Sequence, residues 1–198
     1  MDLMPALLTS PCLRIDRILI SRQIDASTRR LPFRRKIGCG LSPSAFDEQL
    51  REGVISGHVG LRQSLYFVAA ALGRRIEEIS ENRIEPVTDS TSGAGRSHPA
   101  GPGTSGEVLG LRQTLSGQTA DDGAGRTSLD LRFSAFLEAP EEWDRIEVEG
   151  VPSFSSTTTH CIQGETGTVA MLKNSIPALL RASPGLKTAL ELVPPHFH

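Results

Sequence analysis

The second half of the chain carries three strand-like segments in a row, separated by short turn-forming segments. The strands are predicted over Glu107–Ser116, Arg126–Glu138 and Trp143–Glu149. Between them, Gly117–Gly125 and Ala139–Glu142 contain the Asp, Gly and Pro residues that favour turns. Consecutive strands joined by short turns usually pair in opposite directions. The sequence therefore predicts an antiparallel meander over these three strands.

Three other segments have the composition of strands. Leu13–Ile24 is rich in β-branched residues and alternates apolar with polar residues over its first half. Arg74–Val87 alternates less regularly and predicts one long, partly exposed strand. Ser153–Cys161 is again rich in β-branched residues. Strands are therefore expected along most of the chain.

Helices are predicted mainly in the first half. Met1–Ser10 has apolar residues at helical spacing. A second helix is expected to begin at Ser42, a good N-cap residue, and to end near Gly53. Leu61–Leu72 is largely apolar along one side and is followed by Gly73, a favourable C-cap. The third of these helices is expected to lie in the core.

Two segments are harder to assign. The basic stretch Arg29–Lys36 is interpreted as an extended crossing segment. Gly164–Ser183 has helical apolar spacing but contains Pro177, which removes a helical hydrogen bond, so we expect a kink or break near Asn174.

Helices segregated beside hairpin-linked strands indicate an α+β fold, with a mainly antiparallel or mixed sheet and helices on one face. The 198 residues suit one domain that spans residues 1–198. Residues 88–106 are almost all Gly, Ser, Thr and Pro, which predicts a mobile loop.

Charge and composition exclude several classes of partner. The formal net charge is −2, which gives no support for binding to nucleic acid or a membrane surface. Residues 1–40 are nevertheless basic, with eight Lys and Arg against three acidic residues. No apolar stretch is long enough to cross a bilayer. Three cysteines in no metal-ligand spacing, and no signal peptide, favour a reduced, cytoplasmic protein without a metal site.

Well-marked catalytic motifs are absent from the sequence. It contains no G-x-S-x-G, H-E-x-x-H or C-x-x-C, and no glycine-rich phosphate loop in the right context, directly between a strand and a helix start. These residues therefore do not include a dinucleotide-binding half. The sequence also excludes the best-marked hydrolases, zinc proteases and redox proteins.

A few residues could still serve a ligand, and each has a structural alternative. His58 could orient a substrate or cap backbone groups before a helix. His160, at the end of a predicted strand, could line a pocket or be purely structural. The basic cluster Arg29–Lys36 could hold an anion, or form a solvated face or subunit contact. Asn174 could reach a ligand through its amide or mark a helix interruption.

A series of ordered motifs gives the chain a family resemblance. It resembles the C-terminal domain of 2,4-diaminopentanoate dehydrogenase and the related native amine dehydrogenases over essentially its whole length. The motifs are Asp25–Arg30, Lys36–Leu41, Gly57–Ser64, Gly164–Ala170, Asn174–Pro177 and Ala182–Leu186. Departures from the family pattern occur at Arg35, Glu165, Gly167 and Lys173.

The resemblance implies a two-domain plan similar to that of dihydrodipicolinate reductase. A Rossmann domain that binds NAD or NADP, together with the acidic residue that assists deamination, would lie upstream of Met1. The domain seen here would supply the substrate pocket and the contacts of a homodimer. The reaction implied is reversible oxidative deamination of a small aliphatic amine or diamine to a ketone and ammonia.

The resemblance also implies particular site residues. Substrate would contact the opening helix, the segment Leu31–Leu41 and the end of the last strand, while the cofactor would contact the final helix. The substrate-binding residues are Leu3, Met4, Phe33, Ile37 and His160, and the cofactor-binding residues are Thr168 and Asn174. The catalytic residue is not assigned.

Two functional hypotheses follow. The first is the substrate-binding and dimerisation domain of an NAD(P)-dependent amine dehydrogenase. The second is a catalytically inactive, standalone module for oligomerisation or partner binding. Under both, we expect the isolated 198-residue chain to show no turnover and no tight binding of NAD or NADP, because a hydride carrier must be held against the substrate.

Overall fold

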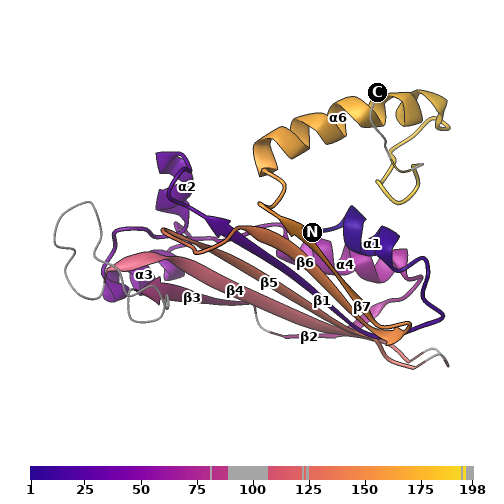
Figure 1. Cartoon of the computed structure of the whole chain (residues 1–198), viewed down its shortest axis with the longest axis horizontal. Helices are drawn as coiled ribbons and strands as arrows, with labels where there is room; N and C mark the ends of the chain where they lie inside the picture. Colours follow the sequence, from indigo (N-terminus) through magenta and orange to yellow (C-terminus); the bar gives the residue numbers. More distant parts are fainter. Residues whose placement is uncertain (81, 89–106, 122, 124, 193, 195–198) are drawn as a thin grey trace.

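A computed structural model describes residues 1–80, 82–88, 107–121, 123, 125–192 and 194 of the chain. One mixed sheet dominates these residues, and helices lie on one side of it (Figure 1). In chain order the elements are α1 (Leu3–Leu8), β1 (Arg14–Asp25), α2 (Leu31–Lys36), α3 (Pro43–Arg51), α4 (Leu61–Ala71), β2 (Ile76–Ile79), β3 (Arg83–Thr88), β4 (Val108–Thr119), β5 (Ser128–Phe136), β6 (Trp143–Val151), β7 (Phe154–Thr159) and α6 (Gly164–Arg181). The α+β class predicted from the sequence is confirmed.

The strand order corrects the predicted meander. The sheet runs β2-β4-β5-β1-β6-β7, with β3 also paired to β4. β4 and β5 form an antiparallel pair as expected, but β5 and β6 do not pair. β1 lies between them, parallel to β5 and antiparallel to β6. A strand from the start of the chain thus occupies the middle of the sheet, and neighbouring turns in the sequence cannot reveal such an insertion.

Three other sequence predictions need correction. Residues 29–36 are not extended, because Leu31–Lys36 forms α2, with Pro32 in the first turn, where its missing N–H costs nothing. Residues 74–87 form two strands, β2 and β3, rather than one. α6 continues unbroken through Pro177 from Gly164 to Arg181. The predicted loop over residues 88–106 lies outside the described residues, except for Thr88, which ends β3.

Two predicted helix boundaries are confirmed by their capping geometry. The Ser42 hydroxyl accepts a hydrogen bond from the backbone N–H of Ala45 at 3.2 Å, which satisfies a free amide at the start of α3. Gly73 follows α4 with φ of +69°, a backbone conformation that favours glycine.

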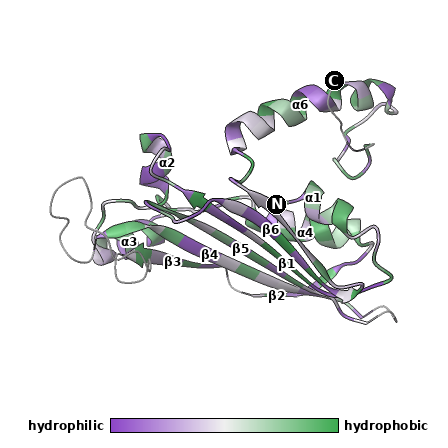
Figure 2. Ribbon diagram, in the orientation of Figure 1, coloured by the Kyte–Doolittle hydropathy of each residue, from purple (hydrophilic) through white to green (hydrophobic). Residues whose placement is uncertain are grey.

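The main core lies between the sheet and the helices α3 and α4. Alternate residues of the central strands point into it, among them Ile18, Ile20, Leu129 and Leu131. From α4, residues including Leu65 are fully buried against them. The resulting alternation of apolar and polar residues is visible along the strands in Figure 2.

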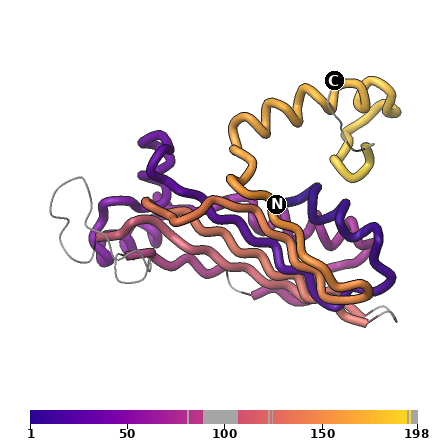
Figure 3. Tube along the Cα trace, viewed as in Figure 1, coloured from indigo at the N-terminus to yellow at the C-terminus, as the bar shows by residue number. Residues whose placement is uncertain are grey.

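The last helix behaves differently. α6 contains no buried residue, although several of its side chains are apolar and exposed, such as Leu172 and Leu180. It stands apart from the sheet, on the same side as α1 (Figure 3). The space between α6, α1 and the sheet is where the candidate site lies.

Candidate functional site

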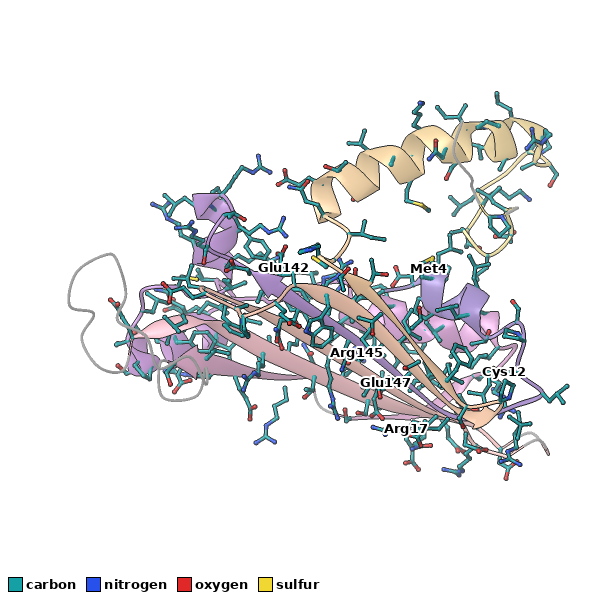
Figure 4. The ribbon with its side chains drawn as sticks, viewed as in Figure 1. Met4, Cys12, Arg17, Glu142, Arg145 and Glu147 are labelled. Atoms are coloured by element: carbon teal, nitrogen blue, oxygen red, sulfur yellow. The ribbon has the colours of Figure 1, made fainter. Side chains whose placement is uncertain are left out.

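A cavity of about 510 Å³ lies between the helix-bearing face of the sheet, α1 and α6. Its floor is formed by β1 and β6, where Ile20 and Ile146 contribute apolar surface. Leu3 and Met4 of α1 form one wall, and Figure 4 shows Met4 on the side of α1 towards α6. Met171 is part of the α6 wall. The cavity is therefore mostly apolar, as is typical of pockets for small organic ligands.

An ion pair between two strands of the floor interrupts this apolar lining. Arg22 on β1 lies directly opposite Asp144 on β6 in the antiparallel register. The guanidinium binds the carboxylate through two hydrogen bonds, from Nε to Oδ1 and from Nη2 to Oδ2, the latter at 2.7 Å. The backbone N–H of Ile162 also donates to Oδ2, at 3.0 Å. Each side chain is 18% exposed, so the pair is largely removed from water.

The ion pair holds both groups in their charged forms. Burial alone would raise the pKa of Asp144, but the hydrogen bond and charge of Arg22, with the Ile162 N–H, outweigh it and lower that pKa. Burial likewise opposes the charge on Arg22, and the hydrogen bond and charge of Asp144 reverse the effect and raise its pKa. Arg22 and Asp144 are thus both charged at neutral pH where they line the cavity.

Both groups keep capacity for a ligand. Within the described residues, the Nη1 group of Arg22 donates no recorded hydrogen bond, and Oδ1 of Asp144 accepts only the one from Nε. A guanidinium has five N–H donors and a carboxylate about four acceptor positions. A ligand carboxylate and a ligand ammonium could therefore each find a partner here.

A second, adjoining cavity lies near α2 and the start of α6. Arg29, Arg30 and Phe33 line it, and it shares Arg22 and Thr168 with the first cavity. Two of its cations are already paired with carboxylates. Arg29 Nη2 lies 2.8 Å from Glu142 Oε1, and Arg30 binds Glu165. This pairing reduces the positive charge that the basic cluster could offer to an anion.

The structure brings only some of the predicted substrate residues together. Leu3 and Met4 line the main cavity, and Phe33 lines the second. Ile37 is 1% exposed in the main core, and neither described cavity includes it. His160 is exposed, with a φ of +60°, and its backbone N–H donates to the Glu142 carbonyl at 2.8 Å.

The two predicted cofactor residues lie on different sides of α6. Thr168 lines both cavities, and its hydroxyl donates to the Gly164 carbonyl at 2.7 Å. Asn174 comes six residues later, about 120° around the helix, and does not line either cavity. Its side-chain Oδ1 is buried and, within the described residues, has no hydrogen-bond partner. An acceptor in that state suits a ligand N–H donor.

The contacts of His58 support a structural role for this residue. Its ring stacks on Phe133 at 5.3 Å, and its backbone N–H donates to the buried side chain of Gln113 at 2.7 Å. Burial, aided by the positive charges of the N-terminal amine and Arg22, lowers the pKa of His58, so the ring is mostly neutral at pH 7. His58 does not line either described cavity.

Arg22 and Asp144 were missed at the sequence level, although a signal was available. Arg22 has the same strand parity as Ile18 and Ile20, which point into the core. Asp144 has the parity of Ile146, which also points inward. A charged residue on the apolar face of a strand indicates a pairing partner or a site. Finding that partner required the β1–β6 register.

The described residues contain neither a membrane-spanning helix nor a metal-binding cluster. No helix in that part of the chain is both long and apolar enough to cross a membrane. No group of three or more His, Cys, Asp or Glu residues there could hold a metal ion.

Comparison with known proteins identifies relatives of the whole chain. Residues 1–197 match the family of the 2,4-diaminopentanoate dehydrogenase C-terminal domain. The 2,4-diaminopentanoate dehydrogenase of Acetoanaerobium sticklandii is 27% identical over 197 residues, which are 98% of this chain and 54% of that protein. An amine dehydrogenase from Mycobacterium smegmatis has a similar structure, with a TM-score of 0.78 at 20% identity, covering 100% of this chain and 56% of that one. The chain therefore spans about half the length of these relatives.

Proposed function

The chain belongs to the 2,4-diaminopentanoate dehydrogenase C-terminal domain family, and from this premise we propose that it is the substrate-binding domain of an NAD(P)-dependent amine dehydrogenase. The reaction is reversible oxidative deamination of a small amine to a ketone and ammonia. The observation that carries the proposal is the apolar cavity with the Arg22–Asp144 pair in its floor. An apolar cavity of this size suits a short aliphatic chain.

The ion pair points to the class of amine. Taking two charges out of water is costly, and an apolar pair of similar volume would often be as stable. Charges kept in a cavity floor therefore favour a binding role. Arg22 would hold a ligand carboxylate and Asp144 an ammonium group. The name of the relative, a diaminopentanoate dehydrogenase, describes a substrate with both groups.

The nicotinamide cofactor would accept or return the hydride, and its binding domain would be a separate part of the protein. Thr168, which lines the cavities, and Asn174, with its buried unpaired oxygen, are the residues of this chain that fit contact with it. The cavity residues would position the substrate and exclude water from it. This division of roles is why the 198-residue chain alone is expected to show no turnover.

Ligand binding tests the proposal without catalysis. Titration calorimetry should show that the purified chain binds 2,4-diaminopentanoate. It should bind 1,3-diaminobutane, which keeps both amino groups and lacks only the carboxylate, at least tenfold more weakly. The double variant Arg22→Met/Asp144→Leu keeps an apolar floor and leaves no charge unpaired, so it should fold and lose this discrimination. Equal affinity of the wild-type chain for both ligands would contradict the assignment of Arg22.

A matched pair of variants on α1 tests the location. Met4 and Leu7 are both partly exposed on this helix, but only Met4 lines the cavity. Met4→Trp should fill the cavity and weaken binding at least tenfold, whereas Leu7→Trp should leave it unchanged. If neither ligand binds the wild-type chain, the noncatalytic module becomes the better explanation.

A further inference from the structure

A second carboxylate lies in the main cavity besides that of Asp144. Asp2 precedes α1 and lines the cavity together with Arg22 and Asp144. The side chain of Asp2 is 50% exposed, so a ligand in the cavity can reach its carboxylate. The N-terminus lies beside α1, on the side of the sheet where α6 stands (Figure 1). Asp2 takes no part in the hydrogen bonds of the Arg22–Asp144 pair.

The carboxylate of Asp2 does not cap α1. An aspartate at the start of a helix usually accepts a hydrogen bond from a backbone N–H of the first turn. The backbone carbonyl of Asp2 accepts from the Ala6 N–H at 3.3 Å, but its side chain makes no capping hydrogen bond. Among the described residues, the recorded partner of the carboxylate is the α-ammonium group of Met1, at 3.9 Å, which is too long for a hydrogen bond. The acceptor positions of Asp2 therefore remain available to a ligand.

The charged side chains in the cavity carry more negative than positive charge. Asp2 and Asp144 are acidic, and Arg22 is the cation that faces them. Arg145 also contributes to the lining, but neighbours on a strand point to opposite faces, and its guanidinium lies over the Trp143 ring, 4.9 Å from the centroid. Burial lowers the pKa of Arg22, whereas Asp144 and then Asp2 raise it, so Asp2 lies within electrostatic reach of the pair. One negative charge is therefore left over for a ligand.

We infer that Asp2 binds the second amino group of a diamino acid, so that the cavity selects a diamine over a monoamine. This inference rests on the proposed function, in which Arg22 holds the carboxylate and Asp144 holds one ammonium group. A diamino acid such as 2,4-diaminopentanoate carries two ammonium groups and one carboxylate at neutral pH. Its charges match those of Asp2, Asp144 and Arg22 one to one. A monoamino acid would leave one carboxylate of the cavity without a partner.

The α-ammonium group of Met1 shows what kind of group fits beside Asp2. Met1 lines the cavity, and its amine lies near both acidic residues. Burial lowers the pKa of this amine, whereas the charges of Asp2 and Asp144 oppose that effect and favour the ammonium form. A ligand ammonium would therefore compete with the α-ammonium group for Asp2.

A half-exposed aspartate can also simply contact water, as most surface aspartates do. Asp2 differs because it lies in the wall of a mostly apolar cavity. A charge in such a place loses part of its hydration and gains more from an opposite charge than it would on an open surface. The two roles differ in one measurable respect, since only a binding role makes the effect of Asp2 depend on which amino groups the ligand carries.

Three ligands that differ by single amino groups test the inference. Titration calorimetry at pH 7 compares 2,4-diaminopentanoate with 2-aminopentanoate, which lacks only the 4-amino group, and with 4-aminopentanoate, which lacks only the 2-amino group. The wild-type chain should bind the diamino acid at least tenfold more tightly than either monoamine. Asp2→Asn keeps the size of the side chain and removes its charge, so it should weaken binding of the diamino acid at least tenfold. It should leave unchanged the affinity for the monoamine whose amino group binds Asp144.

Two further chains serve as controls. Asp47→Asn should leave all three affinities unchanged, because Asp47 is exposed on α3 and lines neither described cavity. A chain extended by several residues before Met1 no longer carries the α-ammonium group beside Asp2, so it should bind the diamino acid more tightly than the wild type. Circular dichroism checks that each variant folds.

The possible failures of the inference and of the proposed function can be distinguished. Equal weakening of all three ligands by Asp2→Asn would overturn the inference, because it would indicate a structural role. An unchanged affinity of Asp2→Asn for the diamino acid would also overturn it, and so would a wild-type chain that binds monoamines as tightly. These outcomes leave the proposed function intact where the wild type still discriminates against 1,3-diaminobutane, which tests Arg22. A wild-type chain that does not bind the diamino acid would overturn both.

Discussion

At the scale of single residues, the polar side chains that point into the core have the clearest roles. Gln113 on β4 is 1% exposed, and its side chain holds the loop before α4. Its Oε1 accepts from the His58 N–H at 2.7 Å, and its Nε2 donates to Asn82 at 2.8 Å. Adding a Cβ at Gly57 would place it 2.5 Å from this Oε1, so the loop closes tightly around the amide. Gln113 thus links β4 to the loop that carries His58.

We predict that Gln113→Leu lowers the free energy of unfolding by about 1–3 kcal/mol, because it leaves the part-buried His58 N–H without its partner, whereas the exposed Asn82 amide can bind water instead. Urea denaturation measures the change. Gln118→Leu is the matched control, since Gln118 lies on the same strand but is only half-buried, with one hydrogen bond to Ser128 at 3.0 Å. The control should cost less than about 1 kcal/mol. Equal losses would show that the amide of Gln113 does not organise the loop.

At the scale of elements, local signals predicted most of the helices and strands. Capping residues located α3 and α4, and alternation located β1, because these elements depend on their own residues and on burial of one face. α2 was missed since its basic residues gave no apolar period, and Arg34 ties it to the preceding turn by donating to the Ala26 carbonyl at 3.1 Å. Such a contact eight residues back along the chain leaves no periodic signal.

The exposed helix α6 should contribute little to the stability of the rest of the chain. It has no buried residue, and its recorded charge contact with the body is the surface pair of Arg30 and Glu165. Ending the chain after Gln163 should therefore lower the free energy of unfolding by no more than about 1–2 kcal/mol. Ligand binding should nevertheless be lost, because α6 forms one wall of the cavity.

Urea denaturation and calorimetry measure the two effects. The control is a chain that ends after Leu192, which keeps α6 and the cavity-lining Ala189 and should retain both stability and binding. A large loss of stability in the shorter chain would show that α6 contributes to the folding of the sheet.

At the scale of the whole molecule, the position of β1 determines both the sheet and the site. The sequence indicated the strands and the α+β class, but not that β1 separates β5 from β6. Burial of Ile18 and Ile20 in the core requires β1 to lie in the sheet, but it does not specify which two strands pair with β1. The position of β1 also creates the Arg22–Asp144 pair, so the polar centre of the cavity could not be assembled before the topology was known. The predicted apolar wall from Leu3 and Met4, by contrast, needed only the resemblance.

Two titratable groups, His58 and Asp144, should govern how the stability of the molecule depends on pH. Burial lowers the pKa of His58, so the unfolded chain takes up a proton there that the folded chain resists, and stability should fall as the pH drops below about 6.5. The pKa of Asp144 is lowered by Arg22, so its contribution is complete above its ordinary pKa and is lost as the pH falls below about 4. Urea denaturation between pH 3 and pH 8 should therefore show two successive losses of stability.

Two variants assign the losses to their residues. His58→Phe keeps a ring against Phe133 and removes the titration, so the loss that begins near pH 6.5 should become smaller while the loss below pH 4 stays. Asp144→Asn should reduce the acid loss, and at pH 7 it should cost about 3 kcal/mol because it leaves the charge of Arg22 without its partner. If both variants keep the wild-type profile, other groups must dominate the pH dependence. If Asp144→Asn is as stable as the wild type at pH 7, the pair does not hold β1, β6 and the start of α6 together.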